Sequence, residues 1–378
     1  MNKVGVLTLP AVSNYGGILQ NYALQVILRT KGIEPITLER RAKRTLFKEV
    51  LSHIKNSVYN RLRGNYYFKL TDKQREYVYS EQIRFKRNYI KSSPLMFSTK
   101  ELDNYIISNS LKSVIVGSDQ VWRSDYTAFL SDMFFCFISN DLNINKVAYA
   151  ASFGKDSIDY SNQDVDAIVK SLSSFRLVSV REESGVKICK KELFCEAEHV
   201  LDPTMLLTRE DYIKNLGLKE SQYNGEGKGV YSYLLDINRK KEELISYLKS
   251  VYQCGAYTVQ PKCFEGDSNQ NIEDYKAPSI EEWLQGFLDA DFVVTDSFHG
   301  TVFSILFNKQ FYAIVNKSKG ASRFESLLKM VGLENRLLDL DELDINNIKD
   351  AVQINYSEVN RKIDSLRESS KDLLFGSL

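Results

Sequence analysis

The residues of this chain best suited to chemistry lie around His299, within the segment Thr295-Asp296-Ser297-Phe298-His299-Gly300-Thr301. An apolar stretch precedes the segment and an apolar helical pattern follows it, so His299 falls at a strand-to-helix junction. Free backbone N–H groups at a helix start attract anions, and an imidazole beside them can exchange protons. We therefore predict an acid/base group next to an anion site. A histidine that only packs at a turn is the structural alternative.

A second candidate group is Gly117-Ser118-Asp119-Gln120-Val121-Trp122, directly after the apolar stretch 113–117. A carboxylate at Asp119 could remove a proton from a hydroxyl. Gln120 could hydrogen-bond a sugar, and Trp122 could stack on its ring. The alternative is an aspartate that caps a helix, followed by a core tryptophan.

Three cations are candidates for binding an anion. Arg181 ends the apolar stretch 177–180, and its planar guanidinium matches a carboxylate or a phosphate. Lys319 and Arg323 lie in a Gly- and Ser-containing segment that leads into a helix, although no P-loop pattern is present. The alternatives are a surface pair of Arg181 with Glu182 and a solvated basic loop.

A glycine turn forms a further candidate site near the start of the chain, at Asn14-Tyr15-Gly16-Gly17 with Gln20. The two glycines would allow a ligand to approach the backbone closely, and the helix start suits an anion or polar sugar groups. The dinucleotide fingerprint GxGxxG is absent. A plain strand-to-helix turn is the alternative.

Short apolar runs alternate with helical patterns along most of the chain, which predicts two doubly wound α/β domains facing one another across a cleft. Strands are expected at 3–9, 33–38, 113–117, 146–150, 176–180 and 198–201, then at 230–235, 256–259, 292–295 and 311–315. We place an N-terminal domain at 1–203, a C-terminal domain at 204–344 and a helical tail at 345–378. A basic helical insertion is expected at about 40–105.

The net charge of +1 argues against a dedicated nucleic-acid-binding protein. Its distribution is uneven, however, because residues 40–91 hold 15 Lys and Arg against 4 Asp and Glu. We see no secretory signal and no apolar run of membrane-spanning length. The five cysteines are scattered and unpaired in sequence, so neither a disulfide framework nor a zinc site is expected. These features predict a cytoplasmic protein.

Six segments in order resemble the polysaccharide pyruvyl transferase family: NYGGILQNYAL (14–24), GSDQVW (117–122), YAASFG (149–154), SVRE (179–182), DPTMLL (202–207) and TDSFHGTVFSI (295–305). The resemblance implies two Rossmann-like domains arranged as in GT-B glycosyltransferases. It also implies transfer of a pyruvyl group from phosphoenolpyruvate to a hexose of a bacterial surface-glycan precursor. That reaction forms a cyclic ketal and releases phosphate, and it requires no metal or cofactor.

The resemblance also assigns roles to residues. His299 matches the active-site histidine, and Asp119 on the facing domain is a second acid/base candidate. Some members carry an arginine two residues before the histidine, where this chain has Ser297. Donor binding is therefore expected from Arg181, Ser297, Gly300, Thr301, Lys319 and Arg323. The acceptor would be held by Asn14, Tyr15, Gly16, Gly17, Gln20, Gln120 and Trp122.

Acceptors of such enzymes are commonly assembled on a lipid diphosphate at the inner membrane face. The basic segment 40–91 could therefore contact anionic headgroups, with a solvated helical hairpin as the alternative. A GT-B glycosyltransferase that uses a nucleotide sugar remains the main alternative function. A non-catalytic carbohydrate-binding protein is a second one, and the missing GxGxxG disfavours an NAD(P)-dependent enzyme.

Overall fold

A computed structural model describes residues 2–42, 69–139, 141–220, 227–267, 271–315, 321–339, 341–342, 348 and 353–378. The candidate donor-binding residue Lys319 lies outside the described residues, and so does the stretch 43–68 of the expected basic insertion. The described part of that insertion contains three helices: α3 (Asp72–Val78), α4 (Ser80–Tyr89) and α5 (Thr99–Ser108).

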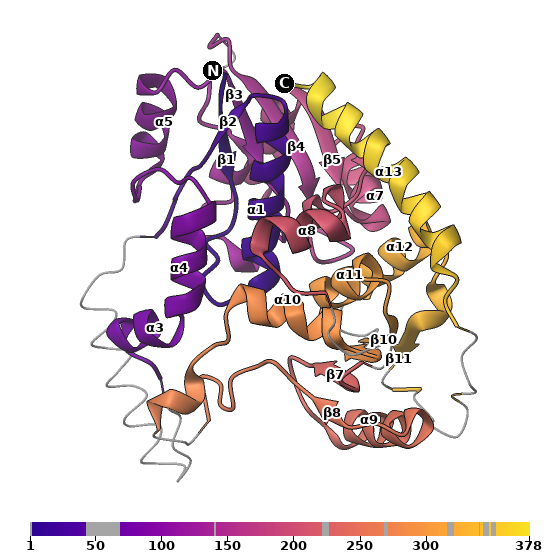
Figure 1. Ribbon diagram of the computed structural model, residues 1–378. Coiled ribbons are helices and arrows are strands. Elements are labelled where there is room, and N and C mark those ends of the chain that lie inside the picture. Colours follow the sequence, from indigo (N-terminus) through magenta and orange to yellow (C-terminus); the bar gives the residue numbers. More distant parts are fainter. Residues whose placement is uncertain are drawn as a thin grey trace.

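The N-terminal half of the chain builds a six-stranded parallel sheet in the order β2-β1-β3-β4-β5-β6 (Figure 1). Its central strands are apolar and buried on both faces, as parallel strands covered by helices must be. The strands are β1 (Lys3–Leu7), β2 (Glu34–Thr37), β3 (Ser113–Val116), β4 (Asn145–Ala151), β5 (Phe175–Val180) and β6 (Glu198–His199). The remaining helices of this half are α1 (Tyr15–Thr30), α6 (Asn162–Leu172), α7 (Glu183–Glu192) and α8 (Arg209–Leu216).

The C-terminal half builds a five-stranded parallel sheet in the order β11-β10-β9-β7-β8. Its strands are β7 (Val230–Tyr233), β8 (Ala256–Tyr257), β9 (Phe292–Thr295), β10 (Gln310–Val315) and β11 (Leu337–Asp339). The helices are α9 (Arg239–Tyr252), α10 (Ile280–Asp289), α11 (Phe298–Leu306) and α12 (Ser322–Val331). Two parallel α/β sheets confirm the predicted fold class, although β11 was not expected from the sequence.

A continuous apolar core joins the two halves, because one buried cluster contains side chains of α1 as well as side chains of α10 and α11. The Tyr15 ring of α1 stacks on the Trp283 ring of α10 with 5.2 Å between centroids, and the Tyr15 hydroxyl donates to the Pro278 carbonyl at 2.7 Å. This packing fixes the N-terminus of α1 against the second domain.

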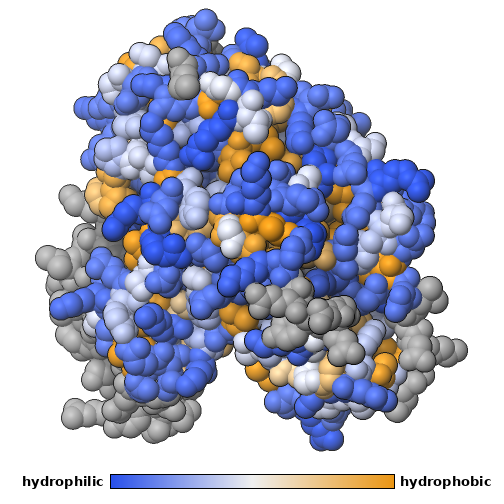
Figure 2. Space-filling model, in the orientation of Figure 1, coloured by the Kyte–Doolittle hydropathy of each residue, from blue (hydrophilic) through white to orange (hydrophobic). Residues whose placement is uncertain are grey.

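The last helix, α13 (Tyr356–Gly376), returns from the second domain along the side of the first (Figure 1). Arg367 donates to the Met205 carbonyl at 2.8 Å, and Ser370 accepts from the Leu201 N–H at 3.2 Å. The visible face is mostly hydrophilic, with smaller hydrophobic patches near its centre (Figure 2). No helix in the described part of the chain combines the length and apolar character that a membrane crossing requires.

Candidate functional site

His299 stands in the first turn of α11, just past the carboxyl end of β9. The turn is held by Ser297, whose side chain accepts from the Gly300 N–H at 3.4 Å as the helix N-cap. Gly300 is required there because a Cβ would lie 2.2 Å from Thr295 Oγ1. The sequence thus places the imidazole by a capped turn at the end of a buried strand, as predicted.

The His299 imidazole faces the other domain. Its Nε2 lies 3.7 Å from Asp202 Oδ2 and has no hydrogen-bond partner. Its Nδ1 lies over the backbone of Gly16, where an added Cβ would be 1.9 Å away. The side chain is 7 % exposed. Residues from both domains therefore enclose one titratable ring.

Asp202 is the centre of this cluster, and it was not singled out from the sequence. Its Oδ2 accepts from Arg181 Nη1 at 2.7 Å and from Ser118 Oγ at 2.9 Å. Its Oδ1 accepts from the Thr204 N–H at 3.0 Å and from Thr204 Oγ1 at 2.7 Å. Burial alone would raise the pKa of Asp202, but His299, Arg181 and Thr204 outweigh burial and hold it well below its usual value. Asp202 therefore remains a carboxylate at neutral pH.

Arg181, which was expected to bind the donor, is surrounded by acidic partners. It is 2 % exposed and lies between Asp202, Asp119 (Nη2 to Oδ1, 3.4 Å) and Glu182 (Nε to Oε2, 3.9 Å). Its guanidinium also packs 4.6 Å from the centre of the Phe298 ring. These contacts make Arg181 an organising residue of the cluster, and its binding of the donor stays a prediction.

Asp119 lies beside these groups in a strained backbone conformation, with φ of 77°. A non-glycine residue in this region persists only where its surroundings enforce it, and such residues gather at functional sites. The carboxylate accepts from Asn14 Nδ2 at 3.4 Å, while Asn14 Oδ1 accepts from the Gly17 N–H at 3.0 Å as the cap of α1. The structure therefore joins the Asn14 turn, Asp119 and Arg181 in one network.

Arg323 is the cation that remains without an ion pair among the described residues near His299. Its guanidinium lies 5.8 Å from the centre of the Phe298 ring, on which Arg181 also packs. Burial and then the neighbouring Arg181 lower the pKa of Arg323. A guanidinium that is partly desolvated and repelled by a second one gains most from an added anion.

Three side chains that were expected to hold the acceptor are buried and have partners within the protein. Trp122 is 1 % exposed, stacks on Phe134 and donates from Nε1 to the Met133 carbonyl. Gln20 donates to Thr8 Oγ1 and to the Gly17 carbonyl, both at 3.0 Å. Tyr15 is occupied by the stacking on Trp283 described above. These residues shape the first domain and its junction, and they do not present a surface to a sugar.

Two groups at the start of α11 that were expected to bind the anion have hydrogen-bond partners within the turn. The Gly300 N–H is capped by Ser297, and the Thr301 hydroxyl donates to the Ser297 carbonyl at 3.2 Å. Ser297 thus acts as a cap. Gln120 is half-buried, and its Oε1 accepts from Arg123 Nη1 at 2.9 Å. In the described part of the chain, no group of three or more His, Cys, Asp or Glu is arranged to hold a metal ion.

The packing of Gly16 against His299 leads to a prediction. Alanine normally stabilises a helix by about 0.5–1 kcal/mol relative to glycine, but at Gly16 the methyl group would overlap the imidazole. We expect Gly16→Ala to lower turnover at least tenfold while the protein stays folded. Turnover and the unfolding midpoint would be measured beside Gly376→Ala, since a Cβ there meets nothing within 4 Å. Turnover close to that of the unmodified protein would contradict the contact.

Comparison with known families gives one match, which covers most of the chain. The family model described as polysaccharide pyruvyl transferase matches residues 14–318. No curated protein matches the chain.

Several solved structures resemble the chain over nearly its whole length. They include S. aureus MnaA with UDP, at 11 % identity over 99 % of this chain and 90 % of that one, with a TM-score of 0.47. The Methanocaldococcus jannaschii UDP-GlcNAc 2-epimerase in complex with UDP-GlcNAc and UDP has 11 % identity, coverages of 97 % and 93 % and a TM-score of 0.44. Acinetobacter baumannii MurG has 7 % identity, coverages of 97 % and 95 % and a TM-score of 0.41. Scores this low carry no argument about function.

Proposed function

Because this chain belongs to the polysaccharide pyruvyl transferase family, we propose that it transfers a pyruvyl group from phosphoenolpyruvate to a hexose of a bacterial surface-glycan precursor. The product would be a cyclic ketal, and phosphate would be released. The observation that carries the proposal is the meeting of His299 from one domain with Asp202 and Gly16 from the other, beside Arg181, which links Asp202 to Asp119. Acid/base groups from both domains would then surround the reacting atoms.

In this mechanism His299 is the acid. A protonated imidazole delivers a proton to the methylene carbon of phosphoenolpyruvate, which makes the adjacent carbon electrophilic. Asp202 lies 3.7 Å from Nε2 on one side of the ring, and Gly16 allows the Nδ1 side to pack closely on α1. The carboxylate of Asp202 would orient the ring, as a buried acid does for a catalytic histidine.

The remaining steps involve two hydroxyl groups of the acceptor. One hydroxyl adds to the activated carbon and loses its proton, and we assign Asp119 as the base. The C–O bond to phosphate then breaks. The second hydroxyl closes the ketal, and its proton leaves with the phosphate. Asn14, which donates to Asp119, is placed to orient that carboxylate.

We assign binding of the anionic donor to Arg323. Arg181 is paired with carboxylates, whereas Arg323 has no ion pair among the described residues. Replacing Arg323 by Gln should raise the KM for phosphoenolpyruvate about tenfold or more, because a charge-assisted contact contributes about 1.5–3 kcal/mol. Steady-state kinetics would measure this, with Arg361→Gln on the exposed surface of α13 as the control. An unchanged KM in the Arg323 variant would remove it from the donor site.

The proposed reaction is tested by offering candidate donors to the enzyme. Phosphoenolpyruvate and nucleotide sugars would be incubated with lipid-linked galactose- and mannose-type acceptors. Release of inorganic phosphate, and a ketal product detected by mass spectrometry, are expected with phosphoenolpyruvate alone. Transfer of a sugar from a nucleotide sugar would instead favour a glycosyltransferase.

The contact of the basic segment 40–91 with an anionic membrane at the cytoplasmic face stays a prediction, since residues 43–68 lie outside the described part of the chain. Vesicle sedimentation with and without anionic lipid would test it.

A further inference from the structure

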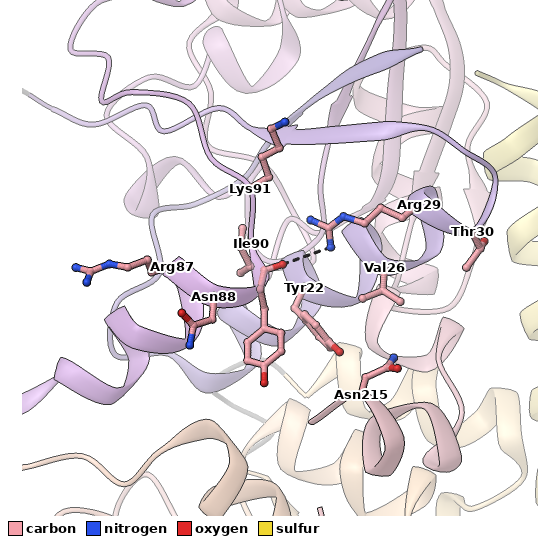
Figure 3. A pocket seen from close by; sticks show the side chains of 10 residues that line it. Tyr22, Val26, Arg29, Thr30, Arg87, Asn88, Ile90, Lys91 and Asn215 are labelled. Carbon is pink, nitrogen blue, oxygen red and sulfur yellow. Dashed lines mark hydrogen bonds between the residues drawn. The ribbon is translucent and has the colours of Figure 1, made fainter. Parts of the chain in front are cut away.

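A groove of about 730 Å³ lies beside the C-terminal half of α1, between α4 and α8 (Figure 3). Three of the side chains that line it are cations, Arg29, Arg87 and Lys91, and none of the lining residues that the structure describes is a carboxylate. Pockets of this volume accommodate small molecules of the size of an oligosaccharide fragment. The groove is separate from the site around His299, and the pyruvyl transfer proposed above does not use it.

Two of the three cations keep an uncompensated charge. The Arg29 guanidinium donates to the Gln25 side-chain oxygen at 2.5 Å and to the Tyr89 carbonyl at 3.4 Å, and both acceptors are neutral. Neither Arg29 nor Arg87 has an ion pair with a carboxylate of the described residues, whereas Lys91 pairs with Glu34. Such a groove attracts a ligand that carries a negative charge.

The rest of the groove offers neutral hydrogen-bonding groups. Tyr22 and Asn215 lie near one another on one side, and Asn88 lies toward Arg87 (Figure 3). Tyr22 is buried, which raises its pKa to about 12, and it contributes a protonated phenol to the wall of the groove. Tyr89 also lines the groove. Its ring packs on Phe85, so part of the ring is covered by the protein. Amides, a phenol and part of an aromatic ring suit the hydroxyl groups and the apolar face of a sugar.

We infer that this groove is a second carbohydrate site, which binds a saccharide bearing a phosphate or a carboxylate group. The cations would hold the anionic group, and Asn88 and Asn215 would hold the sugar hydroxyls. Tyr22 and Arg29 lie about 9 Å and about 20 Å along α1 from Gly16, at a rise of 1.5 Å per residue. Occupation of the groove therefore leaves the space at His299 free.

The charge distribution of the sequence supports the same class of ligand. Helix α4 belongs to the segment 40–91, which holds 15 Lys and Arg against 4 Asp and Glu. The proposed catalytic mechanism does not use this basic excess. Arg87 and Lys91, which belong to the described part of the segment, line the groove. Binding of an anionic ligand there would account for part of the excess of Lys and Arg.

The test is a binding experiment on the full chain with excess phosphoenolpyruvate present, so that the donor site is filled. Glucose 6-phosphate, glucuronic acid and glucose would be titrated by calorimetry or NMR. We expect both acidic sugars to bind at least tenfold more tightly than glucose. The double variant Arg29→Gln/Arg87→Gln should lose that difference. Arg239→Gln/Arg361→Gln, which removes two exposed arginines elsewhere, should keep it.

Several outcomes would overturn the inference. If both double variants bind the acidic sugars equally well, the groove is not their site. If inorganic phosphate binds as tightly as glucose 6-phosphate, the groove binds simple anions and not saccharides. If the Arg29/Arg87 variant binds the acidic sugars as before but no longer binds vesicles that contain phosphatidylglycerol, the groove contacts a membrane surface. His299→Ala should retain glucose 6-phosphate binding, so the result is independent of whether pyruvyl transfer is correct.

Discussion

Replacing His299 by Ala is expected to reduce turnover with phosphoenolpyruvate by about 10²–10⁴-fold, the usual contribution of a positioned acid or base. The imidazole is enclosed by Asp202 and Gly16. No other side chain of α11 can donate a proton near neutral pH in its place. Phosphate release under saturating donor and acceptor would measure the loss.

The control for His299 is Ser297→Ala in the same turn. Losing the cap of α11 should cost about 1 kcal/mol of stability and should leave turnover within a few-fold, since Ser297 holds the backbone of the turn. An unfolding midpoint of the His299 variant close to that of the unmodified protein would show that the fold is retained. Turnover near the unmodified level would end the assignment of His299 as the acid.

Replacing Asp202 by Asn should have the largest effect on stability. Removing one partner of a buried ion pair costs about 3–5 kcal/mol, and here Arg181 would lose its shortest contact. The surviving folded protein should also turn over on the order of 10²-fold more slowly, because the His299 ring would no longer be oriented. Denaturant unfolding and phosphate release measure the two effects separately.

The effect of Asp202 should depend on pH in a defined direction. Its pKa in the folded protein is below the value of about 3.9 expected in the unfolded chain. Its contribution is therefore complete above about pH 4 and is lost as the pH falls through the folded-state value. The difference in stability between the unmodified protein and Asp202→Asn should shrink on acidification. The exposed Asp159→Asn should change stability by less than about 1 kcal/mol, and an equal loss in both variants would contradict the central position of Asp202.

Together these variants distinguish three roles within one cluster. His299 would move the proton, Asp202 would orient the ring, and Arg181 would hold the acidic groups in place. Arg323 is then left as the free cation for the donor. This division differs from the one expected on sequence grounds, in which Arg181 carried the donor.

Local sequence patterns determined much of this protein. Apolar runs of four to seven residues, separated by helical patterns, predicted ten of the strands that the structure contains, because strands of a parallel sheet must be apolar on both faces. The same patterns placed His299 at a strand end, since a capped turn between β9 and α11 depends on neighbours such as Ser297 and Gly300.

The roles of single polar and aromatic side chains were decided by the tertiary structure alone. Trp122 follows a strand as a ligand-binding residue might, yet its ring meets Phe134 and its N–H meets Met133 in the core. Asp202 looked like part of a turn, yet the fold brings His299 and Arg181 to it from distant parts of the chain. Partners so far apart in sequence leave no local pattern, because the free energy of a buried charge depends on which groups fold against it.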